Sequence, residues 1–243
     1  MECKKALTEA EGDMAKAEEI LRVKLGNKAG KAAARITAEG AVASTITGTT
    51  GSLVEVNCET DFVTKNDSFL ALVKAAADLV TKHNPADVDA LGALPFELDG
   101  FGPTLEDVRK GLIGKIGENM SFRRFKRYAN GGKLAGYLHG TRIGVLVEYE
   151  GDDEAFVHGV ALQIASMMPQ YVSRDEIPEA VLATEKRIAE ETAREEGKPE
   201  QILPRIVEGR LNGFYKDVCL VDQASISDDK KSVGQLLKEH GVT

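Results

Sequence analysis

The sequence predicts an α+β fold with antiparallel sheets, on two observations. Segments with the two-residue alternation of β-strands are followed along the chain by segments with helical periodicity. One arrangement, a strand, a glycine-containing turn, a second strand and a helix, occurs twice, with LVEV at 53–56 and LVEY at 146–149 at matching places. We therefore expect two related hairpin-plus-helix subdomains.

Residues 1–30 predict a small, partial helical module. Two short helices are expected within residues 2–25, and the sequence EGD at 11–13 separates them. Their apolar stripes are expected at Cys3, Leu7 and Ala10, then at Ala17, Ile20, Leu21 and Leu25. Because two such helices bury little apolar surface, we expect that the first helix of the module is missing and that Met1 is an internal residue of a longer protein.

Residues 31–132 are expected to form the first subdomain. Strand-like segments flank the turn GTTG, which predicts a β-hairpin. A helical stripe follows, then a loop rich in proline and glycine, and then a second helix that Gly117 ends. The expected elements are strands at 41–47 and 52–59, helices at 67–82 and 105–116, a loop at 85–103, and a strand at 120–129.

Residues 133–172 and 222–243 are expected to form the second subdomain. The turn GTR separates two strand-like segments here, and a helical stripe follows as in the first subdomain. The expected elements are strands at 133–139 and 143–150 and a helix at 154–167.

Residues 173–221, inserted in the second subdomain, predict an antiparallel helical hairpin of coiled-coil type. Apolar side chains recur at spacings of four and three residues on both sides of the turn GKP at 197–199. The expected seam consists of Ile177, Val181, Thr184 and Ile188 on the first helix and Leu203, Val207, Leu211, Phe214 and Val218 on the second. So slender a pair of helices is expected to project from the body of the protein.

The composition is that of a globular protein and argues against several classes. Hydrophobic residues make up 42% of the 243 positions, and no apolar run approaches the roughly 20 residues of a membrane span. The formal net charge of -8 disfavours binding to nucleic acid. Cys3, Cys58 and Cys219 are widely spaced and fit neither a disulfide framework nor a zinc site. A reducing, cytoplasmic location is therefore expected.

Features of an enzyme are few in this sequence. The four histidines lack the spacing of metal ligands, and the serines stand in no nucleophile elbow. The glycines form no phosphate-binding loop. We therefore expect no catalytic residues, no metal ligands and no nucleotide bound by the chain itself.

Residues 122–128, FRRFKRY, combine basic and aromatic side chains. Such a run could stack on single-stranded RNA and neutralise it, which makes an RNA-associated protein the alternative function. The glycines of an RNA-recognition motif are missing, so a strand of a sheet is favoured. With strict alternation Phe122 and Phe125 fall on opposite faces, and one ring is expected to be only partly covered.

The most informative segment is NCETDFV at 57–63, where a predicted strand ends before a helix. From residue types alone, Asp61 is a turn or capping residue and Phe62 is a side chain of the core. The alternative is an exposed aromatic side chain on a rigid corner. Such a side chain could open a groove in another protein, with the aspartate holding position through hydrogen bonds.

Five segments in order along the chain carry a resemblance to a known family. They are MECKKAL at 1–7, VNCETDFV at 56–63, IGEN at 116–119, HGTRIG at 139–144 and VGQLLKE at 233–239. Together they extend over essentially the whole chain and resemble elongation factor Ts, a cytoplasmic family that drives nucleotide exchange on the translational GTPase elongation factor Tu.

The resemblance implies a guanine-nucleotide exchange factor without catalytic chemistry of its own. In the family, the residues matching Asp61 and Phe62 are pushed into the nucleotide domain of elongation factor Tu, where the Phe acts as a wedge and the magnesium and phosphate site is disturbed. The positions matching family contacts are Thr60, Asp61, Phe62, Val63, Ile116, Gly117, His139 and Lys4. No cofactor is expected, since GDP and magnesium are displaced from the partner.

The resemblance also implies an organisation for the chain. The N-terminal module is expected to be UBA-like, and the helical hairpin to be of dimerisation type, which allows a homodimer or a 2:2 complex. Neither nucleic acid nor a membrane is expected as a partner. The chain is expected to be truncated at both ends, so that the second subdomain lacks its C-terminal strand. Ser225 and Ser227 stand where the family often has apolar contact residues.

Overall fold

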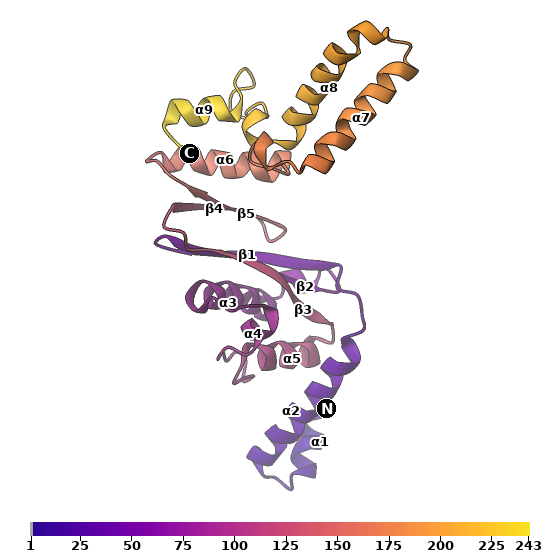
Figure 1. The fold of residues 1–243 in the computed structure, drawn as a ribbon. Helices are drawn as coiled ribbons and strands as arrows, with labels where there is room; N and C mark the ends of the chain where they lie inside the picture. Colours follow the sequence, from indigo (N-terminus) through magenta and orange to yellow (C-terminus); the bar gives the residue numbers. More distant parts are fainter. Residues whose placement is uncertain (1) are drawn as a thin grey trace. The chain divides into compact units, whose positions relative to one another are not determined.

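The computed structural model describes residues 2–243, which fold into two compact units. Unit 1 ends at Glu148, and unit 2 is Tyr149–Thr243. Helices and antiparallel sheets are both present (Figure 1), which confirms the α+β class. The boundary between the units lies inside the expected segment 133–172, and the expected division into four parts stays a prediction.

Unit 1 holds a three-stranded sheet, a two-stranded sheet and helices. Its helices are α1 (Glu2–Glu9), α2 (Met14–Ala32), α3 (Asp67–His83), α4 (Val88–Gly92) and α5 (Leu105–Ile116). Its strands are β1 (Glu39–Thr47), β2 (Thr50–Cys58), β3 (Met120–Tyr128), β4 (Lys133–His139) and β5 (Ile143–Tyr149), which ends at the boundary. The helices and strands expected from the sequence are present, and α4 is an additional helix inside the expected loop.

Helix α2 is longer than the sequence predicts. Asp13 caps it, because its side chain accepts a hydrogen bond from Lys16 N at 3.1 Å. The second half of α2 packs against α5, and Ala29 and Ala32 are buried in the core of unit 1. Tertiary packing therefore extends the helix past residue 25, although two glycines in this half disfavour it locally.

Strands β1, β2 and β3 form an antiparallel sheet in that order, and α3 packs on one of its faces (Figure 1). Alternate residues of β2, Val54, Val56 and Cys58, are at most 1% exposed, as a two-residue period requires. They belong to one apolar core with Phe69 and Leu72 of α3. This core fixes the position where β2 ends and α3 begins.

Strand β3 contains a β-bulge that overturns the expectation for its two phenylalanines. The adjacent residues 55–56 of β2 pair with Arg124 and Phe122, so Arg123 is an extra residue in the strand. The extra residue brings Phe122 and Phe125 to the same face, where both pack against the core of unit 1. The expectation of opposite faces was wrong, and the aromatic half of the RNA-binding pattern loses its support.

The β4–β5 hairpin lies across the other face of the three-stranded sheet. Val42 N donates a hydrogen bond to Thr141 O at 2.8 Å. A Cβ atom at Gly144 would lie 2.6 Å from Leu53 Cδ1 and 3.2 Å from Val42 Cγ2, so glycine lets the hairpin lie close to the sheet without a shift of these side-chain ends. The contact holds the tip of the hairpin at β1.

Unit 2 is predominantly helical. Its helices are α6 (Glu154–Met167), α7 (Glu179–Glu195), α8 (Leu203–Val218) and α9 (Val233–His240). Helix α9 starts with a capping box formed by Ser232 and Gln235, which is a recognisable signal in the sequence. No helix within residues 2–243 is long and apolar enough to cross a membrane.

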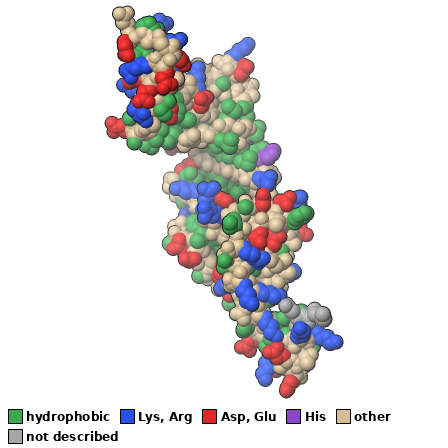
Figure 2. Space-filling view, turned by 90° about the vertical axis from the view of Figure 1, so that its right-hand side faces the viewer, with side chains coloured by type: hydrophobic (Ala, Val, Ile, Leu, Met, Phe, Trp, Pro, Cys, Tyr) green, Lys and Arg blue, Asp and Glu red, His purple; other side chains and the backbone are tan. Residues whose placement is uncertain are grey.

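Helices α7 and α8 pack against each other, but the seam of α7 differs from the expected one. Leu203 of α8 is buried as expected, whereas Ile188 of α7 is 45% exposed and its neighbour Ala189 is 6% exposed. The expectation for Ile188 was wrong, because small alanine side chains face α8 instead. Acidic and basic side chains are interspersed over this pair at the top of Figure 2, including the pair Arg210–Glu196 at 2.8 Å. The coiled-coil type and a role in dimerisation stay predictions.

Candidate protein-binding site

The corner between β2 and α3 carries the segment 60–63. β2 ends at Cys58, and a short 3-10 turn covers Val63–Lys65 before α3 begins. Asn66 caps α3, because its side-chain oxygen accepts a hydrogen bond from Phe69 N at 3.1 Å. Phe69 is fully buried, so the far side of the corner is fixed to the core.

Phe62 and Val63 face opposite environments. Phe62 is 78% exposed, whereas Val63 is 4% exposed and packs in the core of unit 1. The structure therefore contradicts the interpretation of Phe62 as a core side chain and agrees with the alternative, an exposed aromatic side chain on a corner. Val63 occupies the core instead, so its side chain anchors the corner and is not available to another protein.

Local hydrogen bonds keep the corner ordered. Thr64 Oγ1 donates to Asp61 O at 2.7 Å, and Lys65 N donates to Phe62 O at 3.2 Å. Phe62 has φ -64° and ψ -40°, an ordinary helical conformation without strain. The side chains of Asp61 and Phe62 are therefore presented to solvent by a regular and internally bonded turn.

The segment after α5, residues 116–119, lies against the corner. Gly117 ends α5 in a left-handed conformation with φ 92°. The following residue, Glu118, accepts hydrogen bonds from Thr60 N at 3.0 Å and from Thr60 Oγ1 at 2.7 Å. The half-buried Ile116 and the exposed Gly117 are thereby brought close to Thr60.

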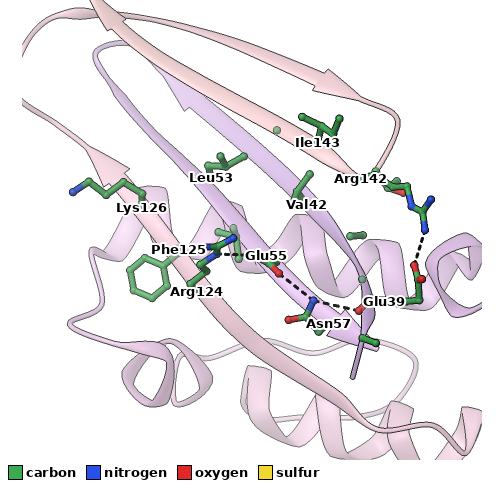
Figure 3. Close-up of a pocket in the computed structure, with 16 residues that line it drawn as sticks. Glu39, Val42, Leu53, Glu55, Asn57, Arg124, Phe125, Lys126, Arg142 and Ile143 are labelled. Atoms are coloured by element: carbon green, nitrogen blue, oxygen red, sulfur yellow. Dashed lines mark hydrogen bonds and ion pairs between the residues drawn. The ribbon is translucent and has the colours of Figure 1, made fainter. Parts of the chain in front are cut away.

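The tip of the β4–β5 hairpin, residues 139–142, is the third part of the site. Arg142 bonds to Glu39 at 2.8 Å (Figure 3). The hydrogen bond and charge of Glu39 raise the pKa of Arg142, and the charge of Asp61 adds to this effect. His139 at the tip is exposed, and its Nδ1 lies 3.2 Å from the Tyr137 hydroxyl. The hairpin tip that carries His139 therefore lies within electrostatic reach of the corner.

An open groove of about 650 Å³ lies between the hairpin and the sheet (Figure 3). Four of the charged side chains that line it form two ion pairs, Arg142 with Glu39 at 2.8 Å and Arg124 with Glu55 at 2.6 Å. Burial raises the pKa of Glu55, but hydrogen bonds from Arg124 and Asn57 outweigh it and hold that pKa below its ordinary value. Glu55 is therefore ionised at neutral pH, and its carboxylate is already hydrogen-bonded to Arg124 and Asn57. Such a group does not suit the role of a general acid or base.

The arrangement is suited to binding another protein. An exposed aromatic side chain with charged and polar groups around it is typical of the strongest positions in protein–protein contacts. Within the part of the chain that the structure describes, no three His, Cys, Asp or Glu side chains are grouped so that they could hold a metal ion.

Lys4 lies apart from the three segments of the site. It is exposed on α1, at the end of unit 1 that is far from the β4–β5 hairpin (Figure 1). The structure thus brings together the predicted residues at 60–63, 116–117 and 139, and it does not bring Lys4 to them. A partner that contacts both regions must extend along unit 1.

Two charged residues of the site escape prediction from the sequence. Glu118 bonds to Thr60, and Arg142 lies within reach of Asp61. Both stand inside segments that carry the family resemblance, next to Gly117 and near His139. Their position inside these segments was the one signal in the sequence that could have marked them as site residues. Their contacts could not be predicted, because the partners lie far away in the chain.

Comparison with known proteins identifies relatives over the whole chain. The family model described as "Elongation factor TS" matches residues 59–243. Elongation factor Ts of Paracidovorax citrulli (strain AAC00-1) is 63% identical over 245 residues, which cover 100% of this chain and 82% of that protein. Elongation factor Ts of Variovorax paradoxus (strain S110) is 59% identical over 98% of this chain and 80% of that protein. Elongation factor Ts of Cupriavidus taiwanensis is 58% identical over 100% of this chain and 82% of that protein.

The difference in burial between two phenylalanines gives a test of the corner. Phe62→Ala should change the free energy of unfolding by no more than about 0.5 kcal/mol, because the side chain is already in water. Phe69→Ala, its buried control, should cost about 3–5 kcal/mol. Urea unfolding followed by circular dichroism measures both. Similar losses for the two variants would show that Phe62 is a core residue in solution.

Proposed function

We propose that this chain, which belongs to the elongation factor Ts family, releases GDP from elongation factor Tu by inserting the corner at Asp61 and Phe62. The family membership carries the general role, a guanine-nucleotide exchange factor for elongation factor Tu in translation elongation. The mode of action is our proposal. The observation that supports it is the 78% exposure of Phe62 on a corner whose next residue is buried.

The exposed ring supplies free energy for opening the partner. Burial of a phenylalanine side chain is worth about 1.5–3 kcal/mol, and this is available only once Phe62 leaves water. An apolar slot between helices of the nucleotide domain would take up the ring. Widening that slot displaces groups that hold the magnesium ion and the phosphates of GDP, so the nucleotide leaves.

Thermodynamic linkage sets the condition for exchange. The chain must bind nucleotide-free elongation factor Tu more tightly than the GDP-bound form, and GDP affinity then falls by the same factor. No chemical step and no cofactor of this chain is involved in such a cycle. We accordingly propose that it is not an enzyme and that it acts in the cytoplasm.

The other contact residues belong to the same proposal. Thr60, Ile116, Gly117 and His139 would surround the inserted tip, and Lys4 would make a separate contact from α1. Val63 would contribute by anchoring the corner, since its side chain is in the core. A homodimer or a 2:2 complex would use the α7–α8 pair.

The proposed function is tested by the release of fluorescent GDP from elongation factor Tu. The wild-type chain should accelerate release, and Phe62→Ala should lower the rate by at least about tenfold, because the loss of 1.5–3 kcal/mol corresponds to such a factor. Phe96→Ala, a change at a half-buried ring of unit 1 outside the corner, serves as control for a general effect of losing a phenylalanine. Normal exchange by folded Phe62→Ala would contradict the wedge.

Asp61 acts by position or by charge, and two substitutions separate these cases. We expect Asp61→Asn to be mild and Asp61→Ala to be damaging, because Asn keeps the shape and one acceptor. A single exposed carboxylate contributes only about 1 kcal/mol through charge, whereas misplacing the tip by about 1 Å can cost far more. GDP release is measured for both variants at low and high salt. Equal defects in both variants that shrink as salt rises would favour charge instead.

A further inference from the structure

Two glutamates join the corner to the segment after α5 in a reciprocal way. Glu118 accepts hydrogen bonds from the backbone N–H and the hydroxyl of Thr60. Glu59, which precedes Thr60, accepts a hydrogen bond from the backbone N–H of Asn119, which follows Glu118. Each segment thus holds the backbone of the other. We call these four residues, Glu59, Thr60, Glu118 and Asn119, the glutamate brace.

Thr60 is held at each of its polar groups. Its N–H and hydroxyl bond to Glu118, and its carbonyl oxygen accepts a hydrogen bond from Cys58 Sγ at 3.2 Å. Burial of Cys58 and the charges of nearby carboxylates, Glu118 first among them, raise the pKa of this thiol to about 11, so it keeps the proton that it donates. Thr60 cannot turn or shift without breaking one of these bonds, and it directly precedes Asp61 and Phe62.

The other half of the brace is held by Arg35. Arg35 Nε lies 3.2 Å from Glu59 Oε1, and the guanidinium also donates to Gly117 O at 3.1 Å. The side chain of Asn119, which is 6% exposed, donates to Arg35 O at 2.8 Å. Arg35 therefore fixes both the carboxylate of Glu59 and the turn at Gly117.

We propose that Glu118 is a positioning residue for nucleotide exchange, which acts through Thr60 to keep the corner from yielding when Phe62 enters the partner. The proposal rests on the proposed function of Phe62 and deepens it. Phe62 touches elongation factor Tu, whereas Glu118 is half-buried behind the corner and acts through the backbone.

Rigidity matters because a wedge opens a groove only if its own support does not move. If the corner moves during insertion, the free energy gained by burying the ring displaces the corner and does not open the groove of the partner. Hydrogen bonds to a carboxylate are stronger than those between neutral groups, so Glu118 suits this task. A corner that is ordered beforehand also avoids a cost of ordering during insertion. Loss of the brace should therefore slow release within the docked complex more than it weakens docking.

The kinetic test measures GDP release at increasing concentrations of wild type, Glu118→Ala, Glu118→Gln and Glu106→Ala. Glu106 is a matched control, a half-buried glutamate of α5 that pairs with Arg109 on its own helix at 2.6 Å. Glu118→Ala should lower the saturating rate roughly tenfold and change the half-saturating concentration less than about threefold. Glu118→Gln should recover most of the rate, because an amide still offers Thr60 an acceptor. Glu106→Ala should leave both quantities unchanged.

A second readout reports on the corner itself. Hydrogen exchange of the Thr60 amide should become at least about tenfold faster in Glu118→Ala, whereas amides in the middle of α3 keep their protection. A merely destabilised protein behaves differently: its smaller folded fraction raises the half-saturating concentration and leaves the saturating rate unchanged.

Several outcomes would overturn the proposal. One is a normal saturating rate for Glu118→Ala, and another is unchanged exchange of the Thr60 amide. A wild-type chain that does not accelerate GDP release would instead refute the proposed function, and the role of Glu118 would fall with it. If Glu118→Ala does not fold, Thr60→Val and Thr60→Ser replace it. Thr60→Val removes the hydroxyl that bonds to Glu118, whereas Thr60→Ser keeps it, so Thr60→Val should have the lower saturating rate of the two. Equal saturating rates for the two variants would overturn the proposed role of Glu118.

Discussion

The pair of hydrogen bonds that Thr60 donates to Glu118 is the interaction on which the candidate site depends. An exposed phenylalanine on a mobile loop would collapse onto the protein or swing away from a groove. Here the residue before the tip is tied to a segment 58 positions away in sequence, and the residue after it, Val63, is buried in the core. Phe62 is thus held from both sides, and its ring stays in water although burial would be worth about 1.5–3 kcal/mol.

The remainder of unit 1 supports that arrangement. Alternate residues of β2 and the buried face of α3 form the core, which fixes the strand before the corner and the helix after it. α5 ends in a left-handed glycine, which turns the chain so that Glu118 meets Thr60. Gly144 allows the β4–β5 hairpin to lie close to the sheet, and this brings Arg142 and His139 to the same region as Asp61. Three distant segments thus form one surface because the core and two glycines permit it.

Much of the fold followed from local patterns, because alternation, helical periodicity and turn residues are properties of neighbouring positions. The full length of α2 was not predicted, because its second half is stabilised by packing against α5. The bulge at Arg123 was not predicted either, because one extra residue in a strand leaves no mark on composition. The exposure of Phe62 could not be decided from residue types, since either Phe62 or Val63 could have filled the core. Glu118 and Arg142 were missed because their roles arise from contacts across the chain. The contact residues themselves came from resemblance to a family, and their roles on the partner stay predictions.

The central claim is that Phe62 is ordered and exposed in the free chain and becomes buried in elongation factor Tu. Fluorine NMR with 4-fluorophenylalanine placed at position 62 tests it most directly, through the change in chemical shift between H₂O and D₂O. The account predicts one narrow resonance with a solvent-dependent shift for the free chain. On addition of nucleotide-free elongation factor Tu, the resonance should move and lose its solvent dependence. A resonance that stays solvent-dependent in the complex would contradict the account.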